Sequence, residues 1–105
     1  MGNEAVGILE VYGLVAAFQC ADAGCKAGNV WLEPFDKNKP KNPDELDVPL
    51  LVCIKFRGQV ADVEAAMDAA VRRAEETVGY VAKHIIAAPT EDARKMLGLC
   101  AFDKK

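Results

Sequence analysis

The 105-residue sequence lacks most features that mark a membrane protein, a metal protein or an enzyme. No apolar run reaches 18 residues, so no membrane-spanning helix is predicted, and no basic segment precedes an apolar one as in an export signal. The single histidine, His84, and the four cysteines form no Cys-x-x-Cys or similar ligand set. Without a Gly-rich phosphate loop or a nucleophile–base pair, the sequence predicts no enzyme and no cofactor.

Basic charge is also scarce. The 13 lysine and arginine residues are outnumbered by 16 aspartate and glutamate residues, which leaves a net charge of −3. Proteins that bind nucleic acid need basic groups that displace counterions from the phosphates. The composition therefore argues against nucleic acid as a general partner, and no membrane partner is expected either.

Apolar residues are abundant, at 51% of the sequence, and they follow the periods of strands and helices. The predicted elements are a strand at 5–11, a helix at 14–27, strands at 30–35 and 50–57, a helix at 60–78, a strand at 81–87 and a short helix capped by Thr90. This β-α-β-β-α-β order with a short C-terminal helix predicts an α+β ferredoxin-like sandwich. We expect a single domain over residues 1–105, with 98–105 as a tail.

A polar loop at residues 36–50 interrupts this pattern. It contains three prolines, and loops of this length in small domains are usually functional or disordered. The loop changes from basic at Lys37, Lys39 and Lys41 to acidic at Asp44, Glu45 and Asp47, and its remaining members near the third strand are Leu46, Val48, Pro49 and Leu50.

The face of the sheet that the two main helices leave open is predicted to be apolar. Alternation along the second strand places Leu32 on one face and both Trp31 and Phe35 on the other. The third strand likewise offers apolar residues to both faces. An apolar open face predicts a partner, a tail folded over it or a self-assembly surface.

Several segments together resemble the bacterial microcompartment (BMC) shell-protein domain, and they lie at residues 5–14, 21–30, 57–66, 78–79 and 84–89. The order of these segments is similar to that of the unpermuted, single-domain class. The resemblance implies a structural shell protein of the bacterial cytoplasm that forms cyclic hexamers, which tile into a shell around encapsulated enzymes. Its partners would be copies of itself and other shell proteins, with small metabolites passing through a central pore.

The resemblance also assigns roles to particular residues. Lys26 and Asn29 match residues at the edge between neighbouring hexamers. The family commonly has an arginine at that edge, where this sequence has Ala88. The 36–50 loop replaces a short glycine-rich pore loop, so six charged copies would converge on the axis. Cys53, the thiol nearest this segment, is a weak candidate ligand for a metal or cluster at a symmetry axis.

A second interpretation remains open from the sequence alone. The same sandwich fold also serves small ligand-binding regulatory domains, in which the 36–49 loop would act as a lid. The residues at 26–29 and 57–58 favour the shell protein.

Overall fold

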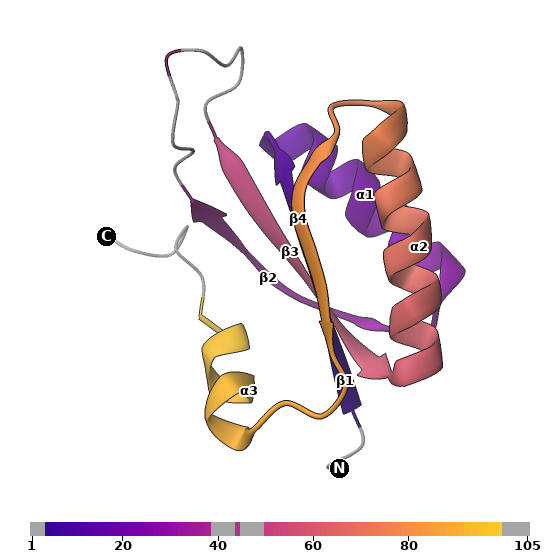
Figure 1. Ribbon diagram of the computed structural model, residues 1–105, viewed down its shortest axis with the longest axis vertical. Coiled ribbons are helices and arrows are strands. Elements are labelled where there is room, and N and C mark those ends of the chain that lie inside the picture. The colour runs from indigo at the N-terminus through magenta and orange to yellow at the C-terminus, as the bar shows by residue number, and fades with distance from the viewer. Residues whose placement is uncertain (1–3, 39–43, 45–49, 100–105) are drawn as a thin grey trace.

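The computed structural model describes residues 4–38, 44 and 50–99, which form a four-stranded antiparallel sheet and three helices (Figure 1). The elements are β1 (Glu4–Tyr12), α1 (Leu14–Ala27), β2 (Trp31–Asn38), β3 (Leu51–Gln59), α2 (Val60–Glu76), β4 (Tyr80–Ile86) and α3 (Glu91–Leu97). The strand order is β2-β3-β1-β4, so β2 and β4 are the edges of the sheet. This architecture confirms the predicted α+β ferredoxin-like sandwich with a short C-terminal helix.

Helices α1 and α2 cover one face of the sheet, and the core lies between these two layers (Figure 1). The fully buried side chains of this core include Leu9, Ile54, Phe56 and Val63. Small residues on the inner face of α1 let the helix approach the sheet closely. Gly24 lies against the Phe56 ring, where even a methyl group would collide with the aromatic carbons.

Strand β2 is longer than the sequence predicted. Its pairing with β3 shifts between Glu33 and Asp36, and it then continues to Asn38, which pairs with Leu51. The prediction that the inserted loop begins at residue 36 is therefore wrong, because residues 36–38 belong to the strand. The shift inserts one extra residue beside Pro34, and proline is confined to edge strands or bulges because it cannot donate a hydrogen bond to the ladder.

The β-bulge also changes which face Phe35 occupies. Beyond the extra residue, the Phe35 side chain lies on the helix side, where its ring packs edge-on against Phe18 with the ring centroids 5.1 Å apart. Trp31 precedes the bulge and pairs with Arg57 on the open face. The prediction that Trp31 and Phe35 share one face of the sheet is therefore wrong, because the bulge lies between them.

Helix α3 covers part of the open face (Figure 1). Thr90 caps the helix as predicted, since its hydroxyl accepts a hydrogen bond from the Ala93 amide at 3.2 Å. Lys55 of β3 is only 4% exposed, and its ammonium donates to the carbonyl oxygens of Leu97 at 2.7 Å and Leu99 at 2.9 Å. The sequence predicted that a partner, a tail or a self-assembly surface would cover the open face. The C-terminal helix α3 is the segment that folds over part of it.

Candidate functional site

The outer face of α1 is apolar along its first half. Val15 is 74% exposed, and Leu14 and Phe18 of the same helix are also exposed. Leu32 on the neighbouring edge strand β2 is exposed as well, and it pairs with Phe56, whose ring lies against Gly24 in the second half of α1. We call these four residues the α1–β2 side.

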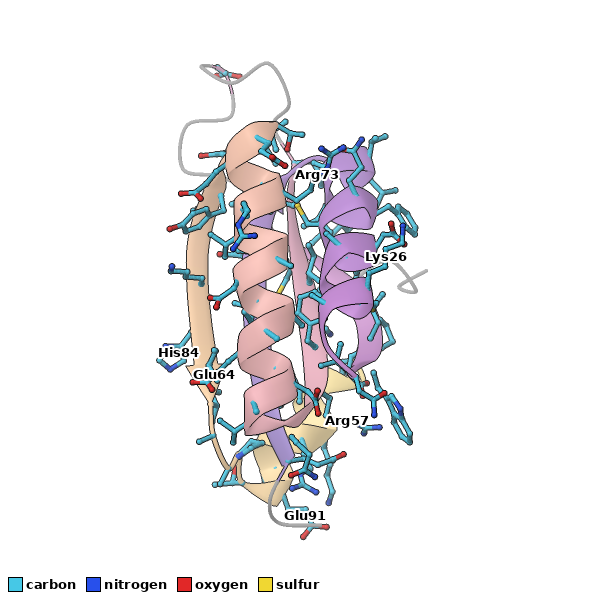
Figure 2. All side chains as sticks on the ribbon, turned by 90° about the vertical axis from the view of Figure 1, so that its right-hand side faces the viewer. Lys26, Arg57, Glu64, Arg73, His84 and Glu91 are labelled. Atoms are coloured by element: carbon cyan, nitrogen blue, oxygen red, sulfur yellow. The ribbon has the colours of Figure 1, made fainter. Side chains whose placement is uncertain are left out.

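A second apolar patch lies across the domain. Val81 of the edge strand β4 is 46% exposed, and Val78, in the turn that precedes the strand, is similarly exposed. We call these two residues the β4 side. Figure 2 shows α1 and β4 at opposite margins of the domain with α2 between them. Edge strands also present unpaired backbone groups, so both sides offer hydrogen bonds as well as apolar contacts to a neighbouring chain.

The second half of the α1 outer face is charged, and it carries the first predicted edge residue. Lys26 lies in the last turn of the helix, 76% exposed, with its ammonium 2.8 Å from a carboxylate oxygen of Asp22. Asn29, the second predicted edge residue, is exposed, and its backbone amide donates to Asp62 Oδ1 at 3.2 Å. Gly28 between them lies against the Asp62 carbonyl, where a side chain would collide, so the end of α1 is held closely to the start of α2.

A cluster beside Asn29, which was not predicted from the sequence, centres on Trp31 and Arg57. The Arg57 guanidinium lies 4.8 Å from the Trp31 ring centroid, and its Nη1 lies 3.3 Å from Glu33 Oε1. Glu4 Oε1 is 3.8 Å from Arg57 Nε. These groups border a shallow hollow of about 180 Å³ whose lining residues are Glu4, Asn29, Trp31, Arg57, Gly58, Gln59 and Asp62. The cross-strand pairing of Trp31 with Arg57 was the missing information, and only the register of β2 against β3 provides it.

The structure describes only three of the predicted loop residues named above, Lys37, Asp44 and Leu50. Lys37 lies in β2 and is exposed, and Asp44 is exposed as well. Leu50 is half-buried against the core, and its carbonyl accepts a hydrogen bond from the Gly13 amide at 2.8 Å. The remaining predicted loop residues lie outside the described part of the chain, namely Lys39, Lys41, Glu45, Leu46, Asp47, Val48 and Pro49.

Cys53, the weak metal candidate, lies half-buried on β3 opposite Glu10 and Asp36 in the sheet register. Burial, and next the Glu10 carboxylate, raise the pKa of this thiol to about 11; Lys55 lowers it, and Asp36 raises it by the least of the four effects. Because a thiolate is the form that binds metal, a thiol protonated at neutral pH is a poor ligand. The described residues hold no group of three or more His, Cys, Asp or Glu side chains placed for a metal ion.

The domain has exposed apolar residues on two sides and polar and charged residues at the end of α1, which suits it to association with other chains. The BMC domain family model matches residues 5–89. The bacterial microcompartment shell protein PduA of Citrobacter freundii is 36% identical over 97 residues, which cover 92% of this chain and 95% of PduA. The carboxysome shell protein CcmK3 of a Halothece species is 31% identical over 102 residues, with 95% and 91% covered. The chain therefore belongs to the BMC domain family.

A solved structure supports the fold assignment. The crystal structure of a microcompartment protein from Desulfitobacterium hafniense matches with a TM-score of 0.70 at 20% sequence identity. The match covers 90% of this chain and 47% of the other, so this chain spans about half the length of that protein. No described helix of this chain is long and apolar enough to cross a membrane.

Proposed function

We propose that this chain is a structural shell protein of a microcompartment in the bacterial cytoplasm, with copies joined side by side in a ring of six. The observation that carries the proposal is the pair of exposed apolar patches on opposite sides of the domain. When the α1–β2 side of one copy meets the β4 side of the next, the contact is head-to-tail, and such contacts form a closed ring when the rotation between successive copies closes. The resemblance to the single-domain class implies that the ring has six members.

The apolar patches favour this association. Their six side chains are about half exposed in the single chain, so burying what remains contributes at most about 5–9 kcal/mol per contact, half of the about 1.5–3 kcal/mol that a fully exposed side chain would contribute. Joining two chains costs about 4–15 kcal/mol of lost freedom. When the last copy of a ring joins, it makes two contacts but loses its translational and rotational freedom only once. This favours a closed ring over an open chain of the same number of copies.

The two ends of the domain would then have different roles. Asn38 and Leu51 pair at the end of the sheet where the inserted segment leaves and returns, opposite the end that bears Asn29. We place the inserted segment at the centre of the ring, where its lysines and acids would control the passage of small charged metabolites. Lys26 and Asn29 would contact neighbouring rings or other shell proteins at the outer edge. No chemical step is assigned to any residue, and enzymes would be enclosed rather than formed by this chain.

The alternative of a ligand-binding regulatory domain has weaker support. Both curated relatives described above are shell proteins over nearly their whole length. The predicted lid of the alternative falls mostly on residues outside the described part of the chain. The ring also accounts for both apolar sides, which a monomeric regulatory domain would leave exposed to water.

Two single substitutions test the head-to-tail contact. Val15→Asp blocks the α1–β2 side and Val81→Asp blocks the β4 side, and each side chain is already exposed, so the fold is preserved. Light scattering after size exclusion should find each variant as a monomer. An equal mixture should form dimers and nothing larger, because each variant keeps the one side that the other needs.

The matched control is Arg72→Asp, on an exposed position of α2. It should form the same ring as the unaltered chain. Rings formed by Val15→Asp or by Val81→Asp alone would contradict the proposal, as would a mixture that stays monomeric.

A further inference from the structure

A charged side chain follows the apolar residues on each of the two sides that the proposed ring joins. Asp22 is the only aspartate or glutamate of α1, and its side chain is 63% exposed one turn beyond Phe18. Lys83 is the only lysine or arginine of β4, and it is exposed two residues beyond Val81. A head-to-tail contact brings different sides together, so these two charges of opposite sign belong to facing surfaces.

Neither charge is fully used within its own chain. The Lys83 ammonium makes no ion pair with a described residue, and it lies 5.5 Å from the centroid of the Tyr80 ring. Asp22 contacts the Lys26 ammonium through Oδ2 at 2.8 Å, in an exposed pair of a kind that contributes little. A carboxylate has two acceptor oxygens, so Asp22 can accept a second ammonium through Oδ1.

Both groups also belong to the same layer of the domain. Lys83 pairs with Leu9 in the sheet register, and Leu9 is fully buried beneath the helices. Directly paired residues share a face of a sheet, so Lys83 lies on the face that carries α1 and α2. Glu33 of β2 pairs with Lys55 on the open face and is already bound to Arg57. A neighbouring copy at the same level would therefore meet Lys83 with α1.

Helix α1 and strand β4 begin at the same end of the domain. The Gly13 amide before α1 donates to the Leu50 carbonyl at 2.8 Å, where the inserted segment returns to the sheet. Tyr80, the first residue of β4, pairs with Val11 near the same end of β1. The proposed ring directs this end toward the axis in every copy, so both elements run outward from the centre.

The two charges lie at matching distances from that end. Asp22 is eight residues from the start of α1, which is about 12 Å along the helix. Lys83 lies opposite Leu9, three residues before the end of β1 and about 10 Å along the sheet. Rotation about the ring axis leaves the distance of each residue from the axis unchanged, so residues of neighbouring copies meet where these distances agree. In the same register Val81 would meet Phe18, which is apolar against apolar.

We propose that Lys83 of one copy binds Asp22 of the next copy at every contact of the ring. The Asp22 carboxylate then lies between two ammonium groups, that of Lys26 in its own helix and that of Lys83 from the neighbour. Apolar contact is not directional, whereas an ion pair has one partner, so the pair determines which part of α1 meets β4. The inference rests on the proposed ring function and adds to it the register of the contact.

Reversal of each charge tests this contact. Lys83→Asp places two carboxylates together at every contact, and Asp22→Lys places two ammonium groups together. By light scattering after size exclusion at low ionic strength, each variant alone should need at least about tenfold more protein than the unaltered chain to form rings. An equal mixture of the two variants should form rings as readily as the unaltered chain, because six copies can alternate so that every contact joins opposite charges. The double variant should do the same.

The controls make the same charge changes away from the two sides, namely Lys95→Asp on exposed α3 and Asp68→Lys on the exposed face of α2. Both should form rings as the unaltered chain does. Single variants that match the unaltered chain would overturn the inference while leaving the ring in place, and so would a mixture that forms rings no better than its components. An unaltered chain that forms no ring at any concentration would overturn both the proposed function and this inference.

Discussion

Lys55→Met removes the buried ammonium that holds α3 while keeping a long apolar side chain. In the native protein that ammonium donates to the Leu97 carbonyl at 2.7 Å and to the Leu99 carbonyl at 2.9 Å. Hydrogen bonds from a charged donor contribute about 1.5–3 kcal/mol each. Two of them stabilise the docked helix by about 3–6 kcal/mol, and methionine leaves both carbonyls without a partner whenever α3 is docked.

The expected effect is local. A loss of about 3 kcal/mol corresponds to more than a hundredfold increase in the undocked population of α3. Hydrogen exchange measured by NMR should show protection of the Ala93–Leu97 amides falling by at least about 100-fold. Amides of the core strands β1 and β3 should change much less, because undocking of α3 leaves the helix-covered core intact. Trypsin should also cut faster at Arg94 and Lys95.

The control is Lys83→Met, which removes an exposed ammonium from β4. It should leave the exchange of α3 amides unchanged. Unaltered α3 protection in Lys55→Met would refute the reasoning. So would a loss of protection spread evenly over the chain, because the lysine would then stabilise the whole fold rather than the docked helix.

Two further predictions concern the core and the thiols. Gly24→Ala should lower the free energy of unfolding, measured in urea, by about 1–3 kcal/mol, because the added methyl group meets the fully buried Phe56 ring; an unchanged midpoint would contradict the packing described. Iodoacetamide at pH 8 should label Cys53 far more slowly than the exposed Cys25, because with a pKa of about 11 only about 0.1% of the Cys53 thiol is ionised. Labelling of Cys53 should accelerate as the pH rises toward 11, and equal rates for both thiols at pH 8 would contradict the burial of Cys53.

The order of elements could be predicted from the sequence because the local signals agree with the fold. Helical and strand periods fall in separate segments, and Gly79 supplies the left-handed turn after α2 with a φ of 80°. Thr90 marks the start of α3 through a side chain that caps only its own first turn. Signals of this kind depend on a few neighbouring residues, so the sequence contains them in full.

The missed features depend on pairing between distant strands. The bulge near Pro34 is not visible in an alternation pattern, yet one extra residue moves Phe35 to the opposite face. The contact between Trp31 and Arg57 follows from the same register, and so does the hollow that they border. Lys55 lies within an apolar strand, where nothing local indicates that a helix 42 residues later will accept its hydrogen bonds.

The most direct test of the central claim is the solution mass of the unaltered chain, measured by light scattering after size exclusion. A ring of six predicts a single species at six times the 11.3 kDa of the chain, and imaging of that fraction should show discs. A mass of one or two chains at every salt and protein concentration would contradict the account, because the two apolar sides would then not bind one another.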